Sequence, residues 1–261
     1  MPFSPARSPS ARGRQDGYVY LLMLALLIVG SLYGLLRHLD PKALQAEQPG
    51  TTARALTTAR DALLGYAATY RESHPDEGYG YFPCPDTHTD TSSPTALDKI
   101  GTADTSCGST GTMAIGLLPY KTLGLPELRD SSGECLWYAV SGRFKNSPKS
   151  DPLNWDAQGE LVITDASGAN IVAAPDDSNG GVAIIVFAPG APLANQASGR
   201  NILGTPCRRD PTQAALYLES TASPFKNGAD SSGSSVNDQL LWLASADVFA
   251  RIRARNDFAT Y

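Results

Sequence analysis

The sequence predicts an α+β fold in which a long N-terminal helix, transmembrane in its first part and amphipathic in its second, packs on an antiparallel β-sheet. Three observations predict it. Twenty uncharged residues follow one another near the N-terminus, an apolar stripe with helical spacing comes next, and several strand-like segments follow. The connections between these segments are too poor in helix for parallel crossovers, which favours an antiparallel sheet. A long disulfide-stapled loop and a short C-terminal helix complete the predicted fold.

Residues 17–36 (GYVYLLMLALLIVGSLYGLL) predict a transmembrane helix. They contain no charged side chain, and twenty residues of helix span about 30 Å, the thickness of a bilayer's hydrocarbon core. Residues 1–16 form a short basic leader, so we expect a cytoplasmic N-terminus and an exported C-terminal domain. One alternative is a cleaved secretory signal, but it would need a shorter apolar core followed by a cleavage site of small residues. The other alternative is a buried core helix. A retained single-span anchor is favoured.

The helix is expected to continue over residues 37–73, with an interruption. Residues 41–50 (PKALQAEQPG) contain two prolines and a glycine, which break the helical pattern. The pattern resumes over residues 51–71, where apolar side chains recur every three or four positions (Leu56, Ala59, Leu63, Ala67, Tyr70). Such a stripe is typical of a helix face that packs on a sheet.

The remaining residues, 74–261, are predicted to form the exported α+β domain. Residues 74–112 are rich in Gly, Pro, Asp, Thr and Ser, which is typical of a long irregular loop. The expected strands are residues 134–144, 160–164, 181–187 and 239–243, of which residues 181–187 (GVAIIVF) have the composition of a fully buried strand. Ser245 is the expected N-cap of a helix that ends near Arg255.

The four cysteines (Cys84, Cys107, Cys135 and Cys207) all follow the apolar run. An even number of cysteines in an exported domain implies two disulfides. Three connectivities are open, and the simplest pairs neighbours: Cys84 with Cys107 across the loop, and Cys135 with Cys207. A zinc site is the alternative, but close pairs such as C-x-x-C are absent from the sequence.

The charges are divided unevenly along the 261 residues, whose formal net charge is −5. Residues 1–42 carry +3 and the remainder carries −8. An acidic chain is not expected to bind nucleic acid through bulk charge. The three histidines (His38, His74, His88) leave little material for a histidine-based metal or hydrolase site. We therefore expect a protein that is not an enzyme.

Several blocks of sequence occur in an order that resembles a known family. They include ALTTARDALLGYAATY, FPCPD (82–86), GLLPYKTLGLPELRDSSGECLWYAVSGRF (116–144), IIVFAPGAPLANQ (184–196) and VNDQLLWLASADVF (236–249). Together with a basic leader that ends in Gly17 before an apolar helix, they are similar to type IV pilins and type II secretion pseudopilins. The likeness extends over most of residues 55–250.

This resemblance implies a pilin-like fold and a structural role. It implies cleavage by prepilin peptidase after Gly17, which leaves Tyr18 as the N-terminus, and assembly through the apolar helix with other pilin-like subunits and an inner-membrane assembly platform. The implied location is the bacterial inner membrane, in a lipid bilayer crossed once, with residues 74–261 in the periplasm. Pilins usually carry Glu at the fifth position after the cut, where this chain has Leu22. That departure fits a minor or initiating pseudopilin-like subunit, or an uncleaved membrane protein that only shares the fold.

Other candidate sites are weighed against simple structural roles. Asp230 and Asp238 are the candidates for calcium ligands, because carboxylates are hard oxygen donors, but no EF-hand pattern is present and no other cofactor is expected. Asp86 is expected to cap a turn. Four aromatic residues (Trp137, Tyr138, Trp155, Trp242) could form a sugar or peptide platform, although strand aromatics are more often core. The alternative function is a membrane-anchored periplasmic binding module or hydrolase outside any filament.

Overall fold

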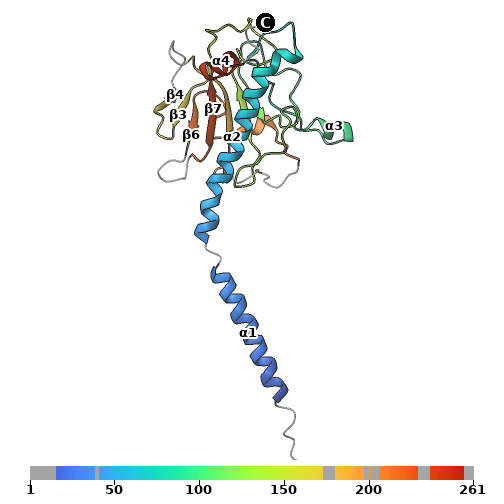
Figure 1. Cartoon of the computed structure of the whole chain (residues 1–261), viewed down its shortest axis with the longest axis vertical. Coiled ribbons are helices and arrows are strands. Elements are labelled where there is room, and N and C mark those ends of the chain that lie inside the picture. Colours follow the sequence, from blue (N-terminus) through green and yellow to red (C-terminus); the bar gives the residue numbers. More distant parts are fainter. Residues whose placement is uncertain are drawn as a thin grey trace, which may run out of the picture. The chain divides into compact units, whose positions relative to one another are not determined.

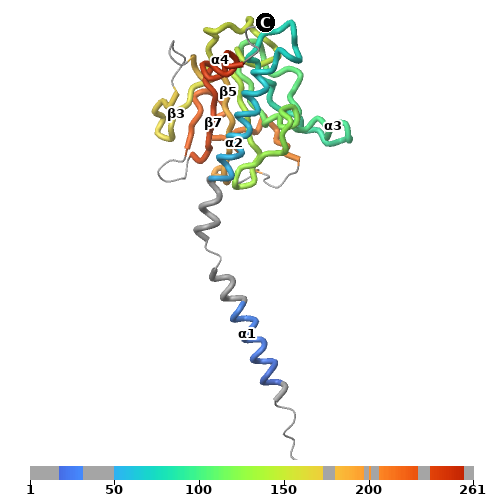
Figure 2. Tube along the Cα trace, viewed as in Figure 1, coloured from blue at the N-terminus to red at the C-terminus, as the bar shows by residue number. Residues whose placement is uncertain are grey.

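The computed structural model describes residues 16–38, 41–172, 180–196, 200, 206–228 and 236–255, with the side chains of residues 18–31 and of the described residues from 50 onward. The chain divides into two compact units, Met1–Glu47 and Gln48–Tyr261. Figure 1 labels the helices and strands, and Figure 2 traces the described residues along the chain.

The first unit contains helix α1 (Asp16–His38). The predicted transmembrane helix is wrong: among the described residues, no helix is both long and apolar enough to cross a membrane. Absence of charge over residues 17–36 is therefore not sufficient to predict a span, which requires a helix that is both long enough and apolar enough. The predicted single-pass inner-membrane location is overturned with it.

Helix α2 (Pro41–Ser73) carries the predicted amphipathic stripe. Its apolar positions are buried, including Leu56, Ala59, Leu63 and Ala67, as the three-to-four spacing predicted. The helix is longer at its start than expected, since it begins at Pro41 and continues through the predicted interruption. A proline at the first helical position is tolerated because its missing N–H would have no partner there.

The main sheet has four antiparallel strands in the order β1-β2-β5-β7. Their bounds are Ala114–Leu117, Trp137–Val140, Val182–Ala188 and Gln239–Ala244. Strand β5 is buried at all seven positions, which confirms the prediction of a fully buried strand. The predicted antiparallel arrangement is therefore confirmed for this sheet, although β2 is shorter than the predicted 134–144.

The second sheet contains three short strands in the order β4-β3-β6. They are β3 (Ile163–Asp165), β4 (Asn170–Val172) and β6 (Phe225–Asn227), of which only β3 lies near a predicted strand, residues 160–164. Strands β3 and β6 run parallel, because the chain between them is long enough to return to the same end of the sheet.

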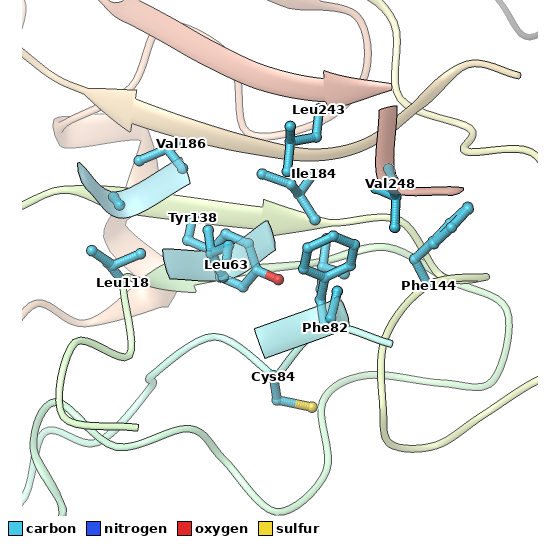
Figure 3. Close-up of a cluster of buried hydrophobic side chains, with 14 of the residues drawn as sticks. Leu63, Phe82, Cys84, Leu118, Tyr138, Phe144, Ile184, Val186, Leu243 and Val248 are labelled. Atoms are coloured by element: carbon cyan, nitrogen blue, oxygen red, sulfur yellow. The ribbon is translucent and has the colours of Figure 1, made fainter. Parts of the chain in front are cut away.

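Two apolar cores lie on the two faces of the main sheet. On one face, α2 side chains such as Leu63 pack against Tyr138 and Ile184, as Figure 3 shows. On the other face, Trp137, Ile185 and Phe225 belong to a second cluster beneath the three-stranded sheet. Successive strand residues point to opposite faces, which is why neighbours such as Trp137 and Tyr138 belong to different cores.

The loop after α2 is irregular, as predicted, apart from the six-residue helix α3 (Pro94–Lys99). A 3-10 helix, η1 (Pro211–Leu216), and a C-terminal helix, α4 (Ser245–Arg253), complete the fold. Ser245 begins α4 instead of capping it. The Ala244 N–H at the cap position donates to the Asp247 carboxylate at 3.2 Å, and the Ser245 hydroxyl donates to the Gly180 carbonyl at 2.5 Å.

The prediction of two disulfides is confirmed. Of the three open connectivities, the structure has Cys84–Cys107 and Cys135–Cys207. The first bond closes the irregular loop, and the second joins the start of the β2 segment to the segment before η1. No cysteine is left to form a zinc site, since all four are paired.

Candidate functional site

Helix α1 presents large apolar side chains around its whole circumference. Eleven of the twelve residues in 18–29 are large, apolar and exposed, with exposed fractions from 47% at Leu22 to 76% at Tyr20. Successive residues of an α-helix are rotated by about 100°, so a consecutive run leaves no polar face. Burying one side chain of this size lowers the free energy of the protein by roughly 1.5–3 kcal/mol relative to leaving it exposed to water. This surface, called the α1 surface below, is therefore stabilised by contact with other apolar groups.

The predicted cleavage position lies at the start of α1. Gly17 and Tyr18 are in its first turn, and Tyr18 is 68% exposed. The first N–H groups of a helix have no partner within it, so few backbone hydrogen bonds oppose opening of this turn. Cleavage after Gly17 stays a prediction.

Asp238, one of the two calcium candidates, is buried and exchanges hydrogen bonds with the half-buried Glu219. The Glu219 N–H donates to Asp238 Oδ2 at 3.0 Å, and the Asp238 N–H donates back to Glu219 Oε2 at 3.1 Å. Burial, and then the nearby Glu219 carboxylate, raise the pKa of Asp238 well above its ordinary value. Asp230 lies outside the described residues. Among those that are described, no group of three or more His, Cys, Asp or Glu side chains could hold a metal ion.

Asp86 caps a turn, as predicted, and also contacts an imidazole. It accepts hydrogen bonds from the His88 N–H at 2.9 Å and the Gly101 N–H at 2.6 Å. Burial raises the pKa of Asp86, although these two donors act to lower it. His88 lies between two carboxylates: Nδ1 is 2.8 Å from Asp86, and Nε2 is 3.4 Å from Asp104. These contacts order the loop that carries Asp86 and His88.

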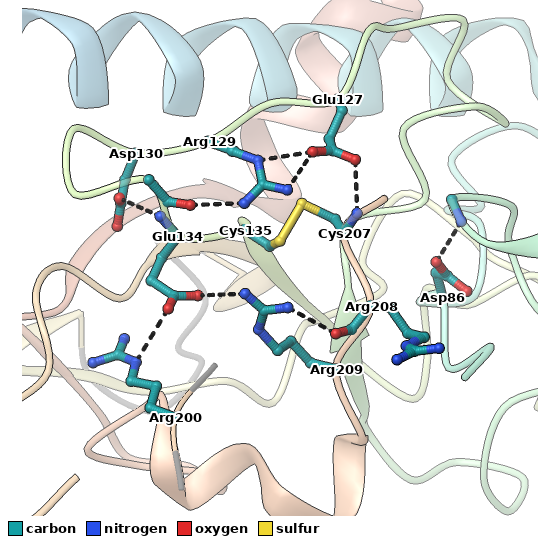
Figure 4. The surroundings of a disulfide bond; sticks show 12 residues. Asp86, Glu127, Arg129, Asp130, Glu134, Cys135, Arg200, Cys207, Arg208 and Arg209 are labelled. Carbon is teal, nitrogen blue, oxygen red and sulfur yellow. Dashed lines mark hydrogen bonds and ion pairs between the residues drawn. A yellow bond between two sulfur atoms is a disulfide. The ribbon is translucent and has the colours of Figure 1, made fainter. Parts of the chain in front are cut away.

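A buried charge cluster surrounds Glu134, beside the Cys135–Cys207 disulfide (Figure 4). Arg200 Nε lies 3.5 Å from one carboxylate oxygen, and Arg209 Nη2 lies 3.2 Å from the other. The Tyr217 ring is within 5.1 and 5.3 Å of the two guanidinium carbons. Removing one partner of such a buried group would leave an uncompensated charge, which is strongly destabilising. The cluster therefore stabilises the contact between segments that are far apart in the sequence.

A groove lined by aromatic and basic side chains lies between the C-terminal end of α2 and α4. Its larger hollow has a volume of about 340 Å³ and is lined by Arg71, Gly78, Tyr79, Leu153, Asn154, Trp155, Phe249 and Ile252. Trp155 is 52% exposed, and its ring meets Phe249 edge-on at 5.4 Å. Gly80 has a φ of +93°, and its place beside Leu153 and Phe249 leaves little room for a side chain. This set of residues is called the aromatic–basic groove below.

The sequence predicted only one member of this groove. Of the four aromatic candidates, Trp137 and Tyr138 are core residues, Trp242 is half-buried, and Trp155 alone is exposed. Apart from Leu153 and Asn154, the other lining residues lie at sequence positions 71–79 and 249–252, far from Trp155. Since no local spacing relates these three segments, only the fold brings them together.

Comparisons of the chain with family models, curated proteins and solved structures find no match.

Proposed function

We propose that the chain is a structural, minor pseudopilin-like subunit of a type II secretion or type IV pilus-like apparatus. The observation that carries the proposal is the α1 surface. An isolated helix with apolar side chains on all sides cannot bury them by itself, whereas several such helices packed together can. In this mechanism α1 associates laterally with the apolar helices of other subunits.

The folded unit supports the proposal in a second way. The sequence blocks that carry the resemblance coincide with structural parts of the fold: FPCPD contains Cys84 and Asp86, LWYAVS contains β2, and VNDQLLWLASADVF contains β7 and the start of α4. Residues in these blocks build the two cores and the buried hydrogen bonds. A resemblance concentrated in such positions supports a shared scaffold more than a shared catalytic site.

Photocrosslinking would test the proposal in bacterial cells that also express pilin-like subunits. A benzoylphenylalanine in place of Leu24, on the α1 surface, is expected to crosslink to the apolar N-terminal helix of another subunit, identified by mass spectrometry of the product. The matched control replaces Leu97, an exposed leucine of α3, and should give no such product.

Two crosslinking results would contradict the proposed assembly surface. If Leu24 gives no crosslink to a pilin-like helix while such subunits are present, or if Leu97 gives the same products, then α1 is not the assembly surface.

A further inference from the structure

The loop that the Cys84–Cys107 disulfide closes brings one imidazole and two carboxylates together. Asp86 and His88 follow Cys84 on one arm of the loop, and Asp104 precedes Cys107 on the other arm. His88 Nδ1 lies 2.8 Å from Asp86 Oδ1, and His88 Nε2 lies 3.4 Å from Asp104 Oδ1. These three side chains are called the His88 cluster below.

Asp86 fixes the orientation and the tautomer of the imidazole. Its side chain is 1% exposed, and each of its oxygens accepts a backbone N–H, Oδ1 from His88 and Oδ2 from Gly101. A carboxylate that accepts at both oxygens has no proton to donate to the ring, so Nδ1 is the donor in the contact with Asp86. In a neutral imidazole, Nε2 then carries a lone pair.

His88 Nε2 and Asp104 Oδ1 are therefore two electron-pair donors that face each other. Their separation of 3.4 Å is longer than the usual N–H···O hydrogen bond of about 2.7–3.2 Å. Two such atoms repel each other unless a positive charge lies between them. Either a proton on Nε2 or a metal ion would supply that charge, and the distance between the two atoms distinguishes these possibilities.

The separation matches two ligands of one tetrahedral metal ion. Zinc lies about 2.0–2.1 Å from a histidine nitrogen and about 2.0–2.2 Å from a carboxylate oxygen. At a tetrahedral angle of about 109°, those bond lengths place the two ligand atoms about 3.3–3.5 Å apart. The distance from His88 Nε2 to Asp104 Oδ1 lies within this range. A proton on Nε2 would instead form a charge-assisted hydrogen bond of about 2.7–2.9 Å.

Neighbouring contacts hold both ligand atoms in place. The Thr87 hydroxyl donates to Asp104 Oδ2, and the Asp104 N–H donates to the Pro85 carbonyl at 3.3 Å. Oδ1 is the Asp104 oxygen that is left to face His88. Histidines that bind metals usually donate their other ring N–H to a carboxylate, as His88 does to Asp86. The arrangement is thus formed before any ion binds, which reduces the entropy lost on binding.

The His88 cluster is accessible to solvent and lies in a negatively charged loop. The side chains of His88 and Asp104 are 26% and 17% exposed. Residues 84–107 contain four aspartates and one lysine, a formal charge of −3. Within the described part of the chain, neither Asp86 nor Asp104 forms an ion pair with a lysine or arginine. The local field therefore attracts a cation.

We propose that the His88 cluster binds a divalent transition-metal ion such as Zn²⁺, with His88 Nε2 and Asp104 Oδ1 as its two protein ligands. Asp86 orients the imidazole and is not a ligand. The described residues place no third His, Cys, Asp or Glu beside these two, so water or a donor from a partner protein fills the other two positions. The site shares no residue with the α1 surface or the aromatic–basic groove, so it does not depend on the proposed assembly.

Isothermal titration calorimetry of the purified full chain, without an added histidine tag, tests the proposal. Titration with ZnCl₂ should show one ion bound per chain. MgCl₂ at the same concentrations should show none, because Mg²⁺ prefers six oxygen ligands and retains its water. All four cysteines are paired, so no thiolate competes for the zinc. Zinc should also raise the temperature of thermal unfolding, since it binds the folded loop.

Variants of the chain locate the ion. His88→Gln and Asp104→Asn each remove one of two ligands and should each abolish measurable zinc binding. Asp86→Asn should weaken binding by about 10–100-fold, because the imidazole loses the group that orients it. The matched controls are His74→Gln, just beyond α2, and Asp98→Asn, at an exposed aspartate of α3, and both should leave binding unchanged. Circular dichroism checks that each variant is folded.

Two results would overturn the proposal. If the unchanged chain binds no zinc, the positive charge between His88 and Asp104 is a proton. If His74→Gln or Asp98→Asn weakens zinc binding as much as His88→Gln does, the ion binds elsewhere. The first result needs no variant, so it remains decisive even if a substitution impairs folding.

Discussion

The two disulfides offer a matched pair of perturbations in one protein. Replacing Cys84 and Cys107 together by Ala removes the bond that spans 23 residues, and replacing Cys135 and Cys207 removes the bond that spans 72 residues. All four half-cystines are buried, so the chemical change is nearly the same in both double variants. The main difference is the length of chain that each bond closes in the unfolded state.

The chain-entropy relation gives the expected sizes. A 23-residue loop corresponds to about 3.4 kcal/mol of stabilisation at 25 °C, and a 72-residue loop corresponds to about 4.4 kcal/mol. The double variant at Cys135 and Cys207 should therefore be the less stable by about 1 kcal/mol. A further loss at this site would come from the adjacent Glu134 cluster if its arginines shift.

Urea unfolding of the full chain measures these free energies. Trp137, Trp155 and Trp242 all lie in the unit Gln48–Tyr261, so tryptophan fluorescence reports on that unit alone. The two double variants should unfold at lower urea midpoints than the unchanged chain and with steeper slopes, because loss of a cross-link expands the unfolded chain. If the Cys84 and Cys107 variant is as unstable as the other or more so, loop length does not determine the contribution of these bonds.

Two further predictions concern single residues. Asp238→Asn should stabilise the chain at pH 8 and not at pH 3.5. The raised pKa of Asp238 gives stability that is present below the ordinary value and lost as pH rises through the folded-state value, about 1.4 kcal/mol for each unit of elevation. Urea midpoints at the two pH values check this, and an equal effect at both would contradict it. Gly159→Ala should destabilise by about 1–3 kcal/mol, because its Cβ would meet the Val182 carbonyl. Gly65→Ala, on the open face of α2, should stabilise by about 0.5–1 kcal/mol and serves as the control.

Long periodic segments were predictable from the sequence, and short ones were not. The stripe on α2 and the continuous apolar run of β5 each follow a pattern over seven residues or more, which specifies both the element and its buried face. Strands β4 and β6 have three residues each, too few for any period to stand out. They form because β3 offers them hydrogen-bonding edges, which is a property of the fold and not of the segments themselves.

Candidate sites with partners nearby in the sequence were likewise predictable, and those with distant partners were not. Asp86 was predictable as a turn cap because its partner, the His88 N–H, is two residues away. The predicted membrane span was wrong, since absence of charge does not by itself establish that a helix is long and apolar enough to cross a bilayer. The partners of Asp238 lie nineteen residues away at Glu219, and those of Trp155 lie in three segments, so neither environment follows from local sequence.

Leucine at position 22 changes what can set the register between helices in the proposed assembly. In the pilins that this chain resembles, a glutamate at that position pairs with a neighbour's N-terminal amine, and a charge pair in apolar surroundings permits only one alignment. Apolar contacts are non-directional, so α1 helices with Leu22 could rotate or slide against one another at little cost. Register must then be fixed by directional groups of the folded unit, such as the arginines at and just after the end of α4 (Arg251, Arg253, Arg255). We therefore expect α1 to supply the affinity of assembly and the unit Gln48–Tyr261 to supply its specificity.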